Sequence, residues 1–259
     1  MRQRLAEASA RSQERGVSAR VTSLDPNEKH VRVFDVTDLD PAFAELITHP
    51  SALPRVRHLL ADDFIVSDVE DNIAEPGSGS IVIHFDLAVV VQPPWTEPWN
   101  INVIWCRDDM WRKNGATQCL PGSHAFQTMS NLPEDMADSM LSFEAKAGSI
   151  LAVDGRLWHT SGENKTRNEE RALLFADYTR SSIPRRLDFE AHLSAATKAL
   201  LSPKRRNRLG LDAPGVKTRA STWSPRPKPP KLSGSRGSQR RPHVGQENAR
   251  SNYVAIPVH

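Results

Sequence analysis

At 259 residues with 38% apolar side chains, the chain can bury one substantial core, and no apolar run is long enough to span a bilayer. The two cysteines, Cys106 and Cys119, exclude a disulfide framework and a C-x-x-C zinc site, so we expect a protein of the reducing cytoplasm. The net charge of +3 is uneven: residues from 204 onward carry +11 and the remainder carries −8.

The first half of the chain begins with an Arg-rich segment that lacks the apolar core of a secretory signal, and we expect residues 1–29 to form a flexible leader. Alternating apolar residues predict a strand over 30–36. Asp40 followed by Pro41 is typical of a helix start, which predicts a helix within 38–50. A second short helix is predicted within 51–63.

The rest of the chain is dominated by short strand-like runs separated by Gly, Pro, Asn and Asp. They lie at residues 64–73, 80–91, 100–107, 116–122, 141–145, 149–155, 157–160 and 171–179. One further helix is predicted over 188–202, with Phe189, Leu193, Ala196 and Leu200 on one stripe. Many short strands without alternating helices predict a mainly β fold, an antiparallel sandwich or barrel with flanking α-helices.

The C-terminal segment, residues 204–259, is rich in Pro, Ser, Gly and Arg and has no apolar periodicity, which is typical of disorder. We therefore expect one folded domain over residues 30–203 and a basic, mostly disordered tail. A basic tail can bind nucleic acid or an acidic membrane surface. A solvated appendage is the simpler interpretation, so we expect neither a membrane partner nor specific nucleic-acid binding.

The run "SIVIHFDLAVVV", residues 80–91, contains two polar side chains inside an apolar strand pattern. With a period of two, His84 and Asp86 project from the same face. A His–Asp hydrogen bond inside a core would also explain the pair, so it does not by itself indicate a metal. His159, which ends another short apolar run, is the best third partner. Two histidines and one carboxylate would form the facial triad that binds Fe(II) and leaves three coordination positions open.

Three ordered motifs then give a resemblance to a known family. His84-x-Asp86, "KNGATQCLPGSH" (113–124) and "AGSILAVDGRLWHTSGENKT…RALLFADYTR" (147–180) resemble the phytanoyl-CoA dioxygenase (PhyH) family. The pattern "NVIWCRDDM…NGATQ" is most similar to fungal-type members that tailor natural products. The resemblance covers roughly residues 30–200. It implies a double-stranded β-helix (jelly-roll, cupin-like) core, with Fe(II), 2-oxoglutarate and O2 as cofactor and cosubstrates.

The resemblance also implies roles for individual residues. His84, Asp86 and His159 match the iron ligands, and Arg171 matches the arginine that binds the distal carboxylate of 2-oxoglutarate. Guanidinium suits that role because it forms a charge-assisted fork with a carboxylate. Thr117 matches a threonine that contacts the cosubstrate in natural-product members, although a strand threonine bonded to its own backbone fits almost as well.

Several other residues remain open. Arg167 and Arg180 are rivals of Arg171, and His124 is assigned to a structural turn. Trp95 and Trp99 fit either the rim of a cavity or an anchor for their loop, while Trp158 is expected to pack beside the metal and fix His159.

The resemblance implies a 2-oxoglutarate-dependent dioxygenase that oxidises a C–H bond of a small organic molecule, producing succinate and CO2. Asp86 argues against a halogenase, which needs that ligand position free for chloride. A non-catalytic jelly-roll binding protein or pseudoenzyme is the alternative. The resemblance also allows a homodimer.

Overall fold

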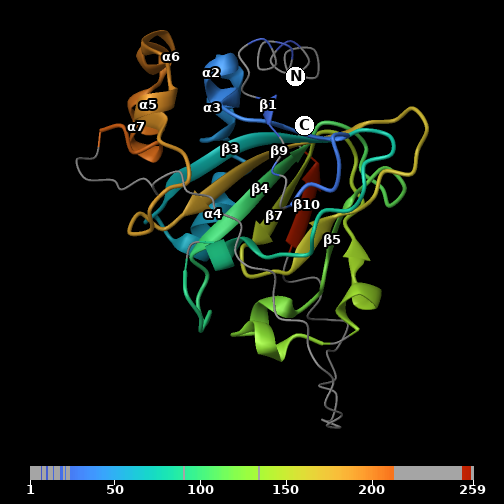
Figure 1. The fold of residues 1–259 in the computed structure, drawn as a ribbon. Helices are drawn as coiled ribbons and strands as arrows, with labels where there is room; N and C mark the ends of the chain where they lie inside the picture. Colours follow the sequence, from blue (N-terminus) through green and yellow to red (C-terminus); the bar gives the residue numbers. More distant parts are fainter. Residues whose placement is uncertain are drawn as a thin grey trace.

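A large antiparallel sheet forms the centre of the computed structural model (Figure 1), which describes residues 24–89, 91–133 and 135–212 together with 7, 10, 14, 18, 19, 21 and 253–257. The strand order is β1-β2-β3-β9-β4-β7-β10. These strands are β1 (Ser18–Ala19), β2 (His30–Val33), β3 (Ile65–Ala74), β4 (Asn100–Cys106), β7 (Ser149–Asp154), β9 (Arg171–Thr179) and β10 (Tyr253–Pro257). A second antiparallel sheet, ordered β6-β5-β8, contains β6 (Leu141–Ser142), β5 (Thr117–Cys119) and β8 (His159–Ser161).

The outer face of the large sheet is covered by helices. Apolar residues of β3, β4 and β9, among them Val69, Val103 and Ala176, form one core cluster with helical residues such as Phe43 and Phe189. Because burying each large apolar side chain stabilises a fold by roughly 1.5–3 kcal/mol, this layer is a major contribution to stability. The inner face of the large sheet turns toward the small sheet, and the candidate site lies between the two.

Among the described residues, six short α-helices flank the sheets: α2 (Val36–Leu39), α3 (Pro41–Leu46), α4 (Leu53–Leu60), α5 (Phe189–His192), α6 (Ala195–Leu200) and α7 (Pro203–Arg208). The predicted start of α3 is confirmed, since the Asp40 side chain accepts a hydrogen bond of 2.8 Å from the Ala42 backbone N–H. Helices α2 and α3 lie beside α5, α6 and α7 (Figure 1), where the Ser194 N–H donates to Asp38 Oδ1.

The single helix predicted over 188–202 is wrong, because the segment forms two helices. Leu193 and Ser194 are extended between α5 and α6, and the Ser194 hydroxyl accepts a hydrogen bond from the Thr197 N–H. Serine side chains compete with helical backbone bonds and favour helix starts, so Ser194 ends the helical stripe. Leu200 consequently lies 67% exposed instead of facing the core.

The strand predicted over 80–91 is also wrong. Only His84 pairs, through an isolated antiparallel bridge in which its N–H and C=O bond with the backbone of His159. From Asp86 to Val89 the chain forms a 3-10 turn (η1), whose Leu87 N–H donates to the Gly155 carbonyl. The β8 partner is three residues long, so it can pair with only a short piece of this segment.

Both ends of the predicted domain differ from the expected boundaries. Within the expected leader, β1 pairs with β2, and buried Asp25 bonds to Arg32. The boundary expected after residue 203 falls inside α7, and the following Leu209 is buried in the core. Most of the expected disordered tail, residues 204–259, lies outside the described residues (213–252 and 258–259), while β10 within it pairs with β7 along the sheet edge.

Candidate functional site

Two side chains of one short segment, His84 and Asp86, meet a third from a distant part of the sequence, His159, between the two sheets. His84 Nε2 lies 3.7 Å from Asp86 Oδ1, and His159 Nε2 lies 3.7 Å from Asp86 Oδ2. The two imidazole rings are 4.4 Å apart. One ligand atom from each residue lies within 4.8 Å of the others, and this is the only such cluster of three among the residues that the structure describes.

Both histidines are oriented by the same backbone contact. Nδ1 of His84 donates to the Val82 carbonyl at 2.8 Å, and Nδ1 of His159 donates to the Leu157 carbonyl at 2.9 Å. A carbonyl can only accept, so the proton lies on Nδ1 and the lone pair on Nε2. Both Nε2 atoms are therefore free to coordinate a metal on the side where Asp86 lies.

The protonation states also suit metal binding. Burial, together with the positive charge that His159 can carry, lowers the pKa of His84 to about 4, so its imidazole is neutral at neutral pH. Burial alone would raise the pKa of Asp86, but His159, His84 and Arg186 together hold it below its ordinary value. A neutral imidazole and an ionised carboxylate are the forms that coordinate metals.

The donor set fits one Fe(II) ion. Two ligands about 2.1 Å from a shared ion at right angles are about 3 Å apart. The 3.7 Å separations at Asp86 therefore require only small side-chain movements to close on one ion. Nitrogen and carboxylate donors in this two-to-one ratio are the set that non-haem Fe(II) oxygenases use.

A polar row on the inner face of the large sheet supports the carboxylate. Asn102 Nδ2 donates to Asp86 Oδ2 at 2.5 Å, and Asn102 lies opposite Asp177 in the β4–β9 register. Asp177 accepts a hydrogen bond from Asn100 and lies opposite Asp68, which pairs with Arg186 at 3.3 Å. This row positions Asp86 and gives one wall of the site a polar surface.

Arg171 is fully buried and has no carboxylate within 4.0 Å among the described residues. Its Nε donates to the Gly115 carbonyl at 3.0 Å, Nη1 to Asn72 Oδ1 at 3.2 Å and Nη2 to Ser161 Oγ at 2.7 Å. Burial lowers the pKa of Arg171 to about 10. A buried cation without an ion-pair partner is costly, which indicates that an anion is missing from its surroundings.

Thr117 lies at the same end of the site. It is opposite Ser161 in the β5–β8 register, and its hydroxyl is buried without a hydrogen-bond partner. The next inward pair of the same register is Cys119 and His159. Two residues along a strand span roughly 7 Å, so the histidine cluster and the Arg171 end are separated by about the length of a small dicarboxylic acid.

The rival arginines are directed elsewhere. Arg167 is exposed. Arg180 donates to the Pro98 carbonyl and lies over the Trp99 ring at 5.3 Å. His124 lies in a 3-10 turn, η2 (Ser123–Ala125), and is not part of the histidine cluster.

The tryptophans act mainly as packing residues around the site. Trp95 is buried and contacts Phe85 with ring centroids 4.5 Å apart, and its indole N–H donates to the Val91 carbonyl. This arrangement favours the loop-anchor interpretation for Trp95. Trp158 also packs against Phe85 at 4.5 Å. The Phe85 cluster therefore supports the segment between His84 and Asp86 from behind.

Sequence reasoning did not identify three polar residues that contact members of the candidate site. Asn102 bonds to Asp86, and Asn72 and Ser161 bond to Arg171. Asn102 and Asn100 had a detectable signal, because two asparagines with a period of two interrupt an otherwise apolar strand. Asn72 and Ser161 had none, since both lie in polar stretches where such residues are common.

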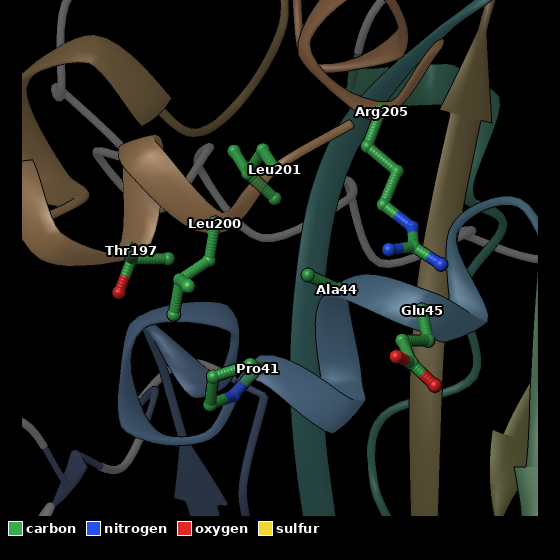
Figure 2. Close-up of a pocket in the computed structure, with 7 residues that line it drawn as sticks. All are labelled: Pro41, Ala44, Glu45, Thr197, Leu200, Leu201 and Arg205. Atoms are coloured by element: carbon green, nitrogen blue, oxygen red, sulfur yellow. The ribbon is translucent and has the colours of Figure 1, made fainter. Parts of the chain in front are cut away.

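A separate surface pocket of about 220 Å³ lies over the helices, not at the histidine cluster (Figure 2). It is lined by Pro41, Ala44, Glu45, Thr197, Leu200, Leu201 and Arg205. Figure 2 shows Leu200 directed toward Pro41 across this pocket. It contains no member of the candidate site.

In the part of the chain that the structure describes, no helix is long and apolar enough to cross a membrane.

Comparisons with known sequences agree with these observations. A family model described as Phytanoyl-CoA dioxygenase (PhyH) matches residues 1–172. The chain is 41% identical over 208 residues to Dioxygenase af480 of Aspergillus fumigatus, covering 80% of this chain and 67% of that relative. It is 32% identical over 94 residues to the iron/alpha-ketoglutarate-dependent dioxygenase ausU of Aspergillus calidoustus, covering 35% of this chain and 31% of that relative. The chain thus spans about two thirds of the first relative and a third of the second.

Two solved structures show the fold. The epimerase SnoN from nogalamycin biosynthesis, in complex with Fe3+, alpha ketoglutarate and nogalamycin RO, matches with a TM-score of 0.55 and 19% identity, over 71% of this chain and 75% of that chain. HygX from Streptomyces hygroscopicus, with nickel, 2-oxoglutarate and hygromycin B bound, matches with a TM-score of 0.52 and 17% identity, over 71% and 82% of the two chains. The expected jelly-roll core is confirmed.

Proposed function

The chain belongs to the phytanoyl-CoA dioxygenase (PhyH) family of iron- and 2-oxoglutarate-dependent dioxygenases, and we propose that it oxidises a C–H bond of a small secondary-metabolite substrate, with 2-oxoglutarate converted to succinate and CO2. The observation that carries this proposal is the convergence of His84, Asp86 and His159. Their free Nε2 atoms and ionised carboxylate provide three coordinating groups on one side of a shared point.

The proposed roles of the individual residues follow from the positions of their side chains. When bound, Fe(II) and 2-oxoglutarate would supply the chemistry by which O2 oxidises the substrate by two electrons. The chain's own residues hold and orient these groups: His84, Asp86 and His159 ligate the ion, and Asn102 fixes the carboxylate through its 2.5 Å hydrogen bond.

At the other end of the site, Arg171 is proposed to bind the distal carboxylate of 2-oxoglutarate. Its guanidinium is buried and already held in place by Gly115, Asn72 and Ser161, so little conformational entropy remains to be lost on binding. The unpartnered hydroxyl of Thr117 is proposed as a further contact to the cosubstrate.

The substrate class rests on the relatives and on the wall of the site. SnoN and HygX were each solved with a natural product, nogalamycin RO and hygromycin B. The row formed by Asn102, Asp177, Asp68 and Arg186 offers hydrogen-bond donors and acceptors, which suits an oxygenated organic molecule. Because Asp86 occupies the third ligand position, oxygenation is the proposed outcome instead of halogenation.

Metal binding and 2-oxoglutarate turnover test the proposal together. We expect the purified apo-protein to bind about one Fe(II) per chain, and the Asp86→Ala, His159→Ala double variant to lose this binding. A His124→Ala variant, which alters a histidine outside the cluster, is the control. Iron binding that survives in the double variant would refute the ligand assignment.

Decarboxylation separates the enzyme from the binding-protein alternative. Under air, with Fe(II), ascorbate and 2-oxoglutarate but no added substrate, we expect slow succinate production by the wild-type protein and none by the double variant. A protein that binds iron and 2-oxoglutarate but produces no succinate above the double variant would be a non-catalytic member of the family.

A further inference from the structure

His30 is a fully buried histidine that the proposed function does not yet use. Its side chain is 0% exposed, and neither ring nitrogen has a hydrogen-bond partner within 3.5 Å among the described residues, although the Asn72 side chain is close enough to raise the pKa of His30 slightly. Its ring Nε2 lies 3.9 Å from Asp25 Oδ1, and that carboxylate already bonds to Arg32. Leaving a buried polar group without a partner destabilises the folded state. Such exceptions are uncommon and indicate a ligand that the protein is built to receive.

The sheet register places His30 beside the Arg171 end of the site. His30 lies opposite Ala74 in the β2–β3 pair, and Ala74 lies opposite Arg171 in the β3–β9 pair. Directly opposed residues project from the same face of a sheet, so the imidazole and the guanidinium both project from the face on which Ala74 lies. Ala74 therefore lies between them in the register, and the side chain of Asn72, which accepts a hydrogen bond from Arg171 Nη1, interacts with both groups.

The small sheet closes over the same place. Gly115 packs against Ala74 so closely that a Cβ added to the glycine would lie 3.5 Å from the Ala74 Cβ. The Gly115 carbonyl also accepts a hydrogen bond from the Nε–H of Arg171. Two residues further along the chain is Thr117, whose hydroxyl is also buried and unpartnered. The strand registers and the Gly115 contacts therefore bring an imidazole, a guanidinium and a hydroxyl into one region of the domain, and no ion pair joins the guanidinium to a carboxylate within 4.0 Å among the described residues.

The electrostatics of His30 agree with this arrangement. Burial and the positive charge of Arg171 lower the pKa of His30 to about 4, against smaller opposing effects of Asp25 and Asn72. The free protein therefore holds a neutral imidazole, which has one N–H to donate. An incoming carboxylate would offset the positive potential of Arg171 and Arg32 and would strengthen a hydrogen bond from the ring.

We propose that His30 is a second binding group for the distal carboxylate of 2-oxoglutarate, donating a ring N–H to one carboxylate oxygen while Arg171 binds the other. This inference rests on the proposed function. A carboxylate has about four acceptor positions, so it can receive both donors together with the Thr117 hydroxyl. His30 thereby helps the site select a dicarboxylic oxo acid over a monocarboxylic one.

The test compares two oxo acids in anaerobic Fe(II) protein, followed by the metal-to-ligand charge-transfer band. 2-Oxoglutarate has the distal carboxylate, whereas 2-oxobutanoate chelates the metal in the same way but lacks it. We expect His30→Leu to weaken 2-oxoglutarate binding by about 10- to 100-fold, the range for one lost charge-assisted hydrogen bond. Binding of 2-oxobutanoate should change less than about twofold, because it makes no contact with His30.

Two further variants define what the loss means. His30→Gln keeps an N–H donor on a similar side chain, and it should recover part of the affinity that His30→Leu loses. His124→Leu makes the same substitution at a half-buried histidine whose Nδ1 is also unpartnered, and it should leave both affinities unchanged. A loss that is equal for both oxo acids, or no loss for either, would overturn the role of His30.

A measurement on the wild-type protein covers the case in which His30→Leu does not fold. Glutarate, a dicarboxylate without a keto group, should shift the 15N ring resonances of His30, and butyrate should not; equal responses would overturn the proposal. Failure of the proposed function looks different. A wild-type Fe(II) protein that develops no charge-transfer band with 2-oxoglutarate would refute the oxygenase itself. A band that forms in the wild type and equally well in His30→Leu would refute only the inference about His30.

Discussion

Replacing Arg171 with methionine should separate cosubstrate binding from folding stability. Arg171 is fully buried, and its guanidinium has four acceptor atoms on three residues but no carboxylate within 4.0 Å among the described residues. If the distal carboxylate of 2-oxoglutarate completes this environment, the variant loses a charge-assisted fork worth roughly 2–5 kcal/mol. The apparent affinity for 2-oxoglutarate should then fall by about 30-fold or more.

The free energy of unfolding of the apo-protein should change much less than the free energy of 2-oxoglutarate binding. Burial lowers the pKa of Arg171 from 12.5 to about 10, so the folded state disfavours the cation by about 3 kcal/mol at neutral pH, and methionine removes this cost. The variant also loses hydrogen bonds to Gly115, Asn72 and Ser161, each worth about 0.5–1.5 kcal/mol. The two effects nearly cancel, so the melting temperature should shift by only a few degrees.

The assay is a titration of 2-oxoglutarate into anaerobic Fe(II) protein, with thermal melting of the apo-protein in parallel. Arg185→Met is the matched control, because Arg185 is also buried but donates to the Leu209 carbonyl and pairs with Asp188, far from the site. It should lose stability and keep its affinity for 2-oxoglutarate. An Arg171→Met protein that develops the charge-transfer band at wild-type concentrations would refute the assignment.

Three further changes test the surroundings of the site. Asn102→Ala removes the hydrogen bond that orients the metal-binding carboxylate, so calorimetry should show Fe(II) affinity reduced by roughly 10- to 100-fold, and Asn100→Ala on the same strand should not reproduce this. Thr117→Val and Thr37→Val each remove a buried unpartnered hydroxyl, so each should raise the free energy of unfolding of the apo-protein by up to about 1 kcal/mol. Only Thr117→Val should weaken 2-oxoglutarate binding; weaker binding in both variants would mean that the loss comes from a change in folding and not from a lost contact. Burial raises the pKa of Asp177 to about 7, so the folded state binds more protons than the unfolded state between pH 3.8 and 7, and stability should fall as pH rises through this range and level off above pH 7. Asp177→Asn should flatten this dependence, by up to about 4 kcal/mol in chemical denaturation; an unchanged pH profile would contradict the assigned pKa.

The local sequence correctly predicted those strands and helices whose own residues show a clear pattern. The strands β3, β4, β7 and β9 carry long β-branched and aromatic runs, and α3 has Asp40 and Pro41 at its start. The predictions failed where a neighbour decides the conformation. The run 80–91 has strand composition but only one short partner, so just His84 forms a bridge.

The candidate site divides in the same way. The sequence itself contained the His84-x-Asp86 spacing, because a short spacing acts within one segment, and it indicated His159 as the third partner; the family resemblance supplied Arg171. The contacts of Asn102 and Ser161 with these residues, and the position of His30 beside Arg171, follow only from the pairing of strands whose partner residues lie 38–114 positions apart in the sequence. Strand pairing is chosen by which faces the whole domain can bury together, and no local pattern records that choice. The sequence by itself therefore determined the family and the metal-ligand types, while the tertiary structure decided which polar side chains surround them.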